Sequence, residues 1–116
     1  MARALELAAR FPGTSGCGYE TLSGRSFDVV INATSAGLTD AAPPLPQGLL
    51  NESTLAYEMV YGRETPFLTL ARKAGARACD GLGMLVEQAA ESFFIWRGVY
   101  PETRSAMAIL RRQMKP

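Results

Sequence analysis

The sequence predicts an α/β protein in which parallel strands alternate with helices. Two runs, residues 27–32 (FDVVIN) and 55–61 (LAYEMVY), are rich in apolar and β-branched residues and lack a strict two-residue alternation. Strands that are covered on both faces of a parallel sheet have this composition. Helical patterns follow each strand candidate, and this order favours parallel strands connected by helices.

The first half of the chain contains one helix, one strand and one long loop. Residues 2–11 (ARALELAARF) place apolar side chains at helical spacing, and the turn formers of residues 12–18 end this helix. The strand at residues 27–32 comes next. Residues 40–48 (DAAPPLPQG) are rich in proline, which removes backbone donors and restricts the preceding residue, so we expect an extended surface loop there.

The second half repeats the alternation of strand and helix. We expect a buried strand at residues 55–61 that ends at Gly62, and then a helix at residues 66–75. Thr65 and Pro66 have the form of an oxygen cap and a proline at the first helical position, and Gly75 marks the end of the helix. Residues 76–80 (ARACD) form a short third strand candidate.

Two helices complete the predicted elements. The first begins at Gly81 and extends to about Trp96, and the second is opened by Pro101 and covers residues 102–114. On the first of these helices Glu87 and Glu91 belong to the solvated face. The pattern puts the buried face on or near the following apolar residues: Leu85, Ala89, Phe93 and Trp96.

Composition excludes several classes of function. The chain has 116 residues, of which 47% are hydrophobic, and this fits one soluble globular domain with a sizeable core. The 12 basic and 11 acidic residues nearly balance, so nothing suggests nucleic acid or an anionic membrane as partner. The chain has no histidine and two isolated cysteines, Cys17 and Cys79, so we expect no metal site and reduced, cytoplasmic thiols. We expect no membrane span and no signal peptide.

Small polar residues follow the first strand in the run NATSAG, residues 32–37. In open α/β sheets ligands bind outside the carboxyl ends of the strands, so Asn32, Thr34 and Ser35 could offer hydrogen-bonding groups there. The small residues of this run let a ligand approach the backbone. For the hexapeptide alone, a plain turn from strand to loop is the preferred interpretation.

The other two strand ends add chemistry at the same predicted edge. The run YEMVYG combines tyrosines with a methionine, although such residues are core by default. The run DGLGMLVEQAAESF starts a helix whose free amides favour polar or anionic groups. Met84 and Gln88 share one face of that helix, where Gln88 could bond a ligand or simply be solvated.

Taken in order, the runs NATSAG, YEMVYG and DGLGMLVEQAAESFFIWRG closely resemble the C-terminal half of shikimate dehydrogenases. The third run is long and specific, and the resemblance covers the whole chain. It implies a Rossmann-like parallel sheet flanked by helices that is incomplete, with residues 1–116 forming the C-terminal portion of an NADP-binding domain. It also implies the NADPH-dependent reduction of 3-dehydroshikimate to shikimate, a cytoplasmic step of the chorismate pathway towards the aromatic amino acids.

The resemblance also assigns roles to individual residues. Tyr61 and Gln88 are expected to reach the substrate from the cofactor side. Arg3 aligns with the end of a basic, serine- and threonine-containing turn that binds the adenosine 2′-phosphate in the family, although a frayed surface charge is an equal alternative. The remaining expected cofactor contacts line the cleft or lie near the nicotinamide: Ala33, Thr34, Ser35, Met59, Gly81 and Met84.

The chain also departs from the family pattern. The glycine-rich phosphate loop and the N-terminal substrate domain, with its catalytic lysine and aspartate, are not in this sequence, so we expect no catalytic residue here and no activity of the chain alone. Glu58 stands where the family commonly has aspartate. Two alternatives remain: a quinate or quinate/shikimate dehydrogenase, and a non-catalytic α/β ligand-binding or interaction domain. A sheet edge left unpaired would also favour a homodimer.

Overall fold

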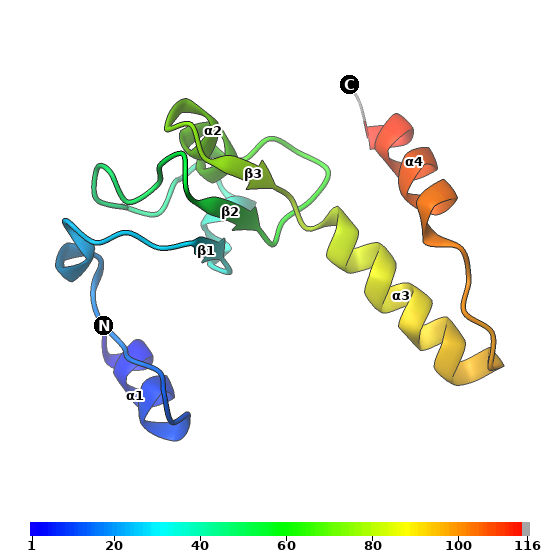
Figure 1. Cartoon of the computed structure of the whole chain (residues 1–116), viewed down its shortest axis with the longest axis horizontal. Helices are drawn as coiled ribbons and strands as arrows, with labels where there is room; N and C mark the ends of the chain where they lie inside the picture. Colours follow the sequence, from blue (N-terminus) through cyan, green and yellow to red (C-terminus); the bar gives the residue numbers. More distant parts are fainter. Residues whose placement is uncertain (115–116) are drawn as a thin grey trace.

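A computed structural model describes residues 1–114 and shows a three-stranded parallel sheet with helices around it (Figure 1). The strands β1 (Val29–Asn32), β2 (Leu55–Glu58) and β3 (Arg77–Cys79) lie side by side in that order. All neighbouring strands are parallel, with Asn32 opposite Glu58 and Tyr57 opposite Cys79. The predicted α/β class with parallel strands is confirmed.

Four α-helices accompany the sheet in the described residues: α1 (Ala2–Arg10), α2 (Pro66–Lys73), α3 (Leu82–Arg97) and α4 (Thr103–Met114). Short 3₁₀ turns occur at η1 (Tyr19–Leu22) and η2 (Ser35–Leu38). Each predicted helix is present, and the proline-rich loop contains neither helix nor strand. No helix of the described part is long and apolar enough to cross a membrane.

The core lies between the sheet and α2. Phe67 and Ala71 of α2 pack with Ala56 of β2 and with Leu50 and Ala76 from the flanking loops. The start of α2 is fixed as predicted, because the Thr65 hydroxyl accepts the Leu68 N–H at 3.3 Å and Pro66 occupies the first turn. This packing holds the carboxyl ends of β1 and β2 in one place.

The expectation that β1 is covered on both faces was wrong. Val30 packs against the core, but Val29 and Ile31 on the other face are 50% and 59% exposed. The reason is that β1 is an edge strand of the sheet and α2 covers one face only. Strand β2 also ends earlier than predicted, at Glu58 instead of just before Gly62.

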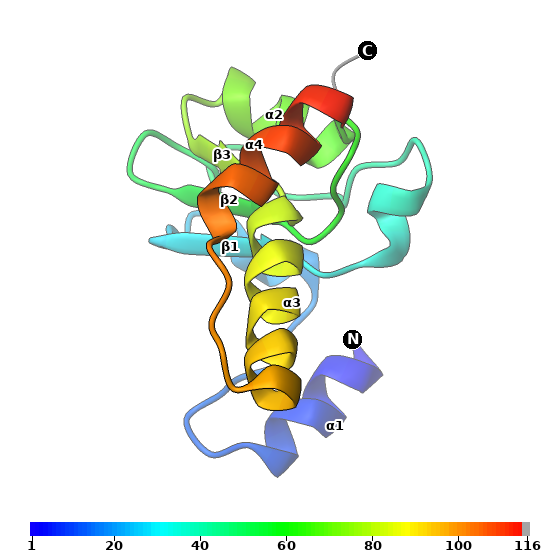
Figure 2. The same ribbon diagram turned by 90° about the vertical axis from the view of Figure 1, so that its right-hand side faces the viewer.

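The predicted buried face of α3 was also wrong. Val86 and Ala90 are buried, whereas Phe93 is 44% and Trp96 is 77% exposed. Leu85, Ala89 and Phe93 line an apolar groove that α3 shares with α4. Helix α4 lies beside α3 (Figure 2) and buries none of its own residues.

The start of α4 differs from the prediction as well. The helix begins at Thr103, two residues after Pro101. The carboxylate of Glu102 caps it, because it accepts the N–H groups of Arg104 and Ser105 at 2.7 and 3.0 Å. The free amides at a helix start prefer an acidic partner, and these two bonds lower the pKa of the Glu102 carboxyl.

Candidate functional site at the carboxyl edge of the sheet

The carboxyl ends of the strands meet at one edge, which faces the start of α3 (Figure 1). The backbone continues the pairing beyond the strands. The Met59 N–H donates to the Asn32 carbonyl at 3.2 Å, and the Gly81 N–H donates to the Val60 carbonyl at 3.2 Å. The segments after β1, β2 and β3 are therefore linked to one another, and we call the region that they form the carboxyl edge.

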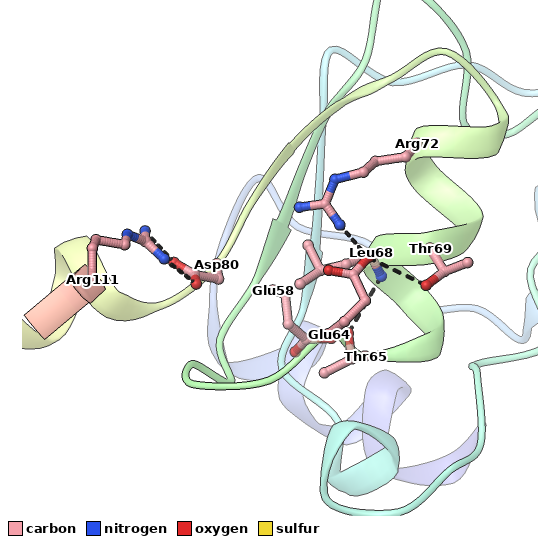
Figure 3. A network of polar contacts seen from close by, with 8 residues as sticks. All are labelled: Glu58, Glu64, Thr65, Leu68, Thr69, Arg72, Asp80 and Arg111. Atoms are coloured by element: carbon pink, nitrogen blue, oxygen red, sulfur yellow. Dashed lines mark hydrogen bonds and ion pairs between the residues drawn. The ribbon is translucent and has the colours of Figure 1, made fainter. Parts of the chain in front are cut away.

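A buried carboxylate organises this edge. Glu58 at the end of β2 is fully buried and accepts three hydrogen bonds. Its Oε2 accepts the Asn32 amide at 2.8 Å and the Thr65 hydroxyl at 2.9 Å, and its Oε1 accepts the Val60 N–H at 3.2 Å. Thr65 is also the cap of α2 (Figure 3), so Glu58 joins β1, β2 and the start of α2. The longer side chain at this position is accommodated with all of these bonds made.

Asn32 transmits this order to the run that follows β1. Its Oδ1 accepts both the N–H and the hydroxyl of Thr34, at 3.2 and 2.7 Å. The Thr34 hydroxyl in turn accepts the Ala36 N–H at 3.3 Å and caps the 3₁₀ turn η2. Because Asn32 is 4% exposed and its amide is engaged inside the protein, it does not offer that group to a ligand. The run NATSAG therefore forms a turn that is stabilised by hydrogen bonds among its own residues.

Gly81 allows the third segment to approach so closely. A Cβ at this position would lie 2.1 Å from the Met59 carbonyl oxygen, far inside the contact distance. Only glycine can bring the start of α3 against the end of β2 in this way. Two of the predicted contacts, Met59 and Gly81, are thus in direct backbone contact.

An ion pair fixes the start of α3 from the other side (Figure 3). Arg111 of α4 donates to both oxygens of Asp80, Nη1 to Oδ2 at 2.5 Å and Nη2 to Oδ1 at 2.6 Å. The same Oδ1 accepts the Leu82 N–H at 3.2 Å. The hydrogen bond from Arg111 holds the pKa of the Asp80 carboxyl below its ordinary value, and desolvation only partly opposes this. Asp80 therefore connects β3, α3 and α4.

Most of the predicted site residues lie along this edge. Ala33, Thr34 and Ser35 are exposed after β1. Met59 and Tyr61 follow β2, and Met84 lies in the first turn of α3; their side chains are 38%, 42% and 41% exposed. Half-exposed apolar and phenolic groups of this kind are available to a ligand. The arrangement is consistent with these assignments, which stay predictions.

Two predicted residues lie apart from that group. Gln88 is exposed on α3, roughly 10 Å along the helix from Gly81 at 1.5 Å per residue, and its amide donates to the Leu85 carbonyl at 2.9 Å. Arg3 lies on α1 with Glu6 and Arg10, and Figure 1 shows α1 on the opposite side from α3. The structure does not bring Arg3 into contact with the carboxyl edge.

A polar cavity of about 670 Å³ lies between α2, α4 and the loop after β2. Its lining includes Arg63, Arg72 and Arg111, but each arginine pairs with a carboxylate. Arg72 pairs with Glu64 and Arg111 with Asp80 (Figure 3), and Arg63 pairs with Asp40. These charges balance one another, so the described residues of the lining leave no free cation for an anionic ligand. Within residues 1–114 no group of three or more acidic, cysteine or histidine side chains could hold a metal ion.

Sequence reasoning missed the two polar clusters that shape the edge. In the sequence Glu58 stands out only as a longer side chain, and nothing singles out Asp80 or Arg111. An asparagine and a carboxylate that end adjacent parallel strands could have pointed to the first cluster. No local pattern signals the second, because Asp80 and Arg111 are 31 positions apart.

Comparison with known proteins shows which proteins this chain is similar to. The model of the shikimate 5′-dehydrogenase C-terminal domain matches residues 81–111, which begin at Gly81 and end at Arg111. The shikimate dehydrogenase (NADP(+)) of Dechloromonas aromatica is 53% identical over 97% of this chain, and that of Methylobacillus flagellatus is 55% identical over 94%. The chain is thus similar to a part of these shikimate dehydrogenases, and the matching family model is that of their C-terminal domain.

Solved structures agree with this correspondence. An Ael1 enzyme from Pseudomonas putida has a TM-score of 0.83 and 54% identity, covering 94% of this chain and 41% of that one. Shikimate 5-dehydrogenase from Thermus thermophilus, in complex with NADP(H) and shikimate, has a TM-score of 0.78 and 35% identity, covering 98% and 43%. The Rossmann-like fold is thereby confirmed. This chain spans 43% and 42% of the length of the Dechloromonas and Methylobacillus enzymes named above.

Proposed function

We propose that this chain is part of a cytoplasmic, NADP-dependent shikimate dehydrogenase and forms one side of its cofactor and substrate sites. In this proposal residues 1–116 are the C-terminal portion of the NADP-binding domain, and the glycine-rich loop and the substrate domain lie outside them. The observation that carries the proposal is the carboxyl edge itself, where Gly81 brings the segment carrying Met59 and the helix carrying Met84 into backbone contact.

The residues of the edge suit a dinucleotide in their chemistry. Gly81 lets the segments that carry Met59 and Met84 come together, and the exposed thioethers of these two methionines offer apolar contact to a flat ring. Ala33, Thr34 and Ser35 would line the cleft with small groups. Arg3 would meet the 2′-phosphate, because a guanidinium binds phosphate through paired N–H groups.

In the reaction this chain would bind the cofactor and the substrate and orient them. NADPH, when bound, supplies the hydride that reduces the ketone of 3-dehydroshikimate to the alcohol of shikimate. Tyr61 and Gln88 would hydrogen-bond the substrate from the cofactor side, Gln88 by exchanging its bond to the Leu85 carbonyl for one to a substrate hydroxyl. No acid or base for the proton is assigned to these residues, so the proton donor lies elsewhere in the enzyme.

A chimera tests the proposal. This chain would replace the matching segment of the Dechloromonas aromatica enzyme, with the unaltered enzyme as reference. We expect NADP-dependent oxidation of shikimate, and we expect Gln88→Ala to raise the KM for shikimate about tenfold, the effect of one lost hydrogen bond of roughly 1.4 kcal/mol. Glu91→Ala, at an exposed position in the next turn of α3, is the matched control and should leave the KM unchanged.

Two results would contradict the proposal. A folded chimera that binds NADP but does not oxidise shikimate would contradict the proposed activity. An unchanged KM for shikimate in Gln88→Ala would contradict the proposed role of that glutamine. Isothermal titration of the chain alone with NADP should show weak binding or none, because the phosphate loop is outside it. Tight binding would instead favour the non-catalytic ligand-binding alternative, and turnover of quinate by the chimera would favour the broader specificity.

A further inference from the structure

Only one assignment of donors and acceptors fits the hydrogen bonds around Asn32 and Glu58. The Thr34 N–H can only donate, so the Asn32 atom facing it is the oxygen Oδ1 and the atom facing Glu58 is the amide nitrogen. The Val60 N–H can only donate to Glu58 as well. Thr65 accepts the Leu68 N–H and so has its own hydrogen free for Glu58. Glu58 must therefore accept at both of its oxygens.

Both ends of this chain of bonds reach the carboxyl edge. On one side Glu58 orients Asn32, and Asn32 holds the N–H and hydroxyl of Thr34. On the other side Glu58 holds the backbone of Val60, which lies between Met59 and Tyr61 in the sequence. One buried carboxylate thus fixes two of the three segments that form the edge.

We propose that Asn32 and Glu58 act as a pair of positioning residues that set the placement of Thr34 and of the Met59–Tyr61 segment for cofactor binding. The pair touches neither cofactor nor substrate, because both side chains are buried and engaged with each other. This inference rests on the proposed function, since it takes Thr34 and Met59 as cofactor contacts.

The direction of the bonds gives the proposal a sharp test. In Glu58→Gln one acceptor oxygen becomes an NH₂ group. If that group faces Asn32, two amide donors oppose each other, and a flip of Asn32 to relieve this costs the Thr34 N–H its acceptor. If it faces Val60, the Val60 N–H loses its acceptor. With the flip of Asn32, or with the NH₂ group at Val60, one backbone N–H at the carboxyl edge is left without its partner.

The exchanged pair, Asn32→Asp combined with Glu58→Gln, restores both backbone bonds. The introduced aspartate would accept the Thr34 N–H and hydroxyl. The introduced glutamine would donate one amide hydrogen to that aspartate and the other to the Thr65 oxygen, while its own oxygen accepts the Val60 N–H, so only the bond with Thr65 changes direction. The exchange also keeps a single buried carboxylate at this place. A rescue by this pair depends on the polarity of the bonds and cannot come from side-chain volume alone.

The first measurement uses the full chain and follows hydrogen exchange of individual backbone amides by NMR. We expect Glu58→Gln to lower the protection of the Thr34 or Val60 amide at least about tenfold, and the exchanged pair to restore both. The second measurement uses the chimera described above. There Glu58→Gln should raise the KM for NADP roughly tenfold with a smaller change in kcat, and the exchanged pair should return it to the wild-type value.

Thr54→Val provides the matched control. Thr54 is 1% exposed at the opposite, amino end of β2, where its hydroxyl donates to the Phe27 carbonyl and accepts the Asn51 N–H. This variant should lower the melting temperature while the protection of Thr34 and Val60 and the KM for NADP stay unchanged. A purely structural role of Glu58 would give the same pattern as Thr54.

Each outcome decides the proposal. Unchanged amide protection in Glu58→Gln overturns it, and so does lost protection without a change in the KM for NADP. If Glu58→Gln does not fold, the exchanged pair alone decides, because a wild-type KM supports the pairing and a raised KM overturns it. A chimera that is inactive even without substitutions would contradict the proposed function, while the amide measurement on the chain would still test the pairing.

Discussion

Gly81 determines how closely the start of α3 approaches the end of β2. The missing Cβ leaves room for the Met59 carbonyl oxygen. A Cβ at residue 81 would lie only 2.1 Å from that oxygen. Gly83, two residues later, is not confined in this way, since a Cβ there would meet only the end of Met107 at 3.8 Å. The two glycines therefore predict opposite effects of the same substitution.

We expect Gly81→Ala to lower the free energy of unfolding by about 1–3 kcal/mol, because the backbone of two segments must move apart. Gly83→Ala should raise it by up to about 1 kcal/mol, since alanine is the better helix former and the space is open. Urea denaturation of both variants would measure the difference. Equal effects of the two substitutions would show that the contact between Gly81 and Met59 does not constrain the fold.

For single residues, the sequence predicted conformational roles such as helix capping better than it predicted which side chains hydrogen-bond to each other. Thr65 was correctly expected to cap α2, because the cap depends on residues three apart. The bond between Asn32 and Glu58 could not be derived, because it depends on the register of β1 against β2, and a slip of one residue would put the two side chains on opposite faces of the sheet. Where Gln88 and Arg3 meet a ligand stays a prediction.

Helix α4 contacts α3 along an apolar groove without fully burying any of its own residues, and the pair of Arg111 and Asp80 joins it to the start of α3. The side chain of Asp80 is 14% exposed and that of Arg111 is 46% exposed. Two parallel hydrogen bonds between a guanidinium and a partly buried carboxylate are stronger than an ordinary surface ion pair.

The pair predicts a pH dependence of stability. The pKa of Asp80 lies below its ordinary value of 3.8 in the folded state, so its contribution is complete above the unfolded pKa and is lost as the pH falls through the folded pKa. Arg111→Gln should reduce the free energy of unfolding on the order of 1 kcal/mol at about pH 6 and progressively less below about pH 4. Urea denaturation across this range would measure it.

Arg63→Gln is the control for the ion pair. Arg63 pairs with Asp40, whose side chain is fully exposed, so solvent screens this interaction and its loss should change stability little. If Arg111→Gln lost the same free energy at every pH, or no more than Arg63→Gln, the pair would not be what anchors α4.

The elements themselves were predicted well, and their orientation less so. All four helices and three strands of the described chain occur where the periodicity indicated. The face of α3 was mistaken because apolar residues occur on more than one face, and the local pattern cannot tell which of them meets the core. That choice depends on how the chain leaves β3, which Asp80 and Gly81 determine through contacts with α4 and β2.

Apolar side chains remain exposed over a large part of the whole molecule. They come from α1, from the open face and edge of β1, and from the second half of α3 with the residues after it: Leu5, Leu7, Phe11, Val29, Ile31, Phe93, Phe94, Ile95, Trp96, Val99 and Tyr100. Larger exposed apolar surfaces of this kind mark sites of association. The proposed enzyme would cover part of this surface with its remaining segments.

The chain alone should therefore associate with itself. The edge of β1 presents unpaired backbone groups next to the exposed Ile31, and a second copy could pair there. We expect sedimentation velocity to show dimers or larger species that increase with concentration, and Ile31→Lys to shift the distribution towards monomer. Lys73→Arg, at an exposed position of α2, is the control. A wild-type chain that stays monomeric at high concentration would contradict association through this edge.

The link between Asp80 and Arg111 also has a consequence for how the protein is made. During translation Asp80 is synthesised before its partner Arg111, which follows 31 positions later. Until then the newly made β3 and the start of α3 have no anchor to α4. The start of α3 thus gains its contact with α4 only after the residues up to Arg111 have been made, whereas its contact with the end of β2 can form earlier.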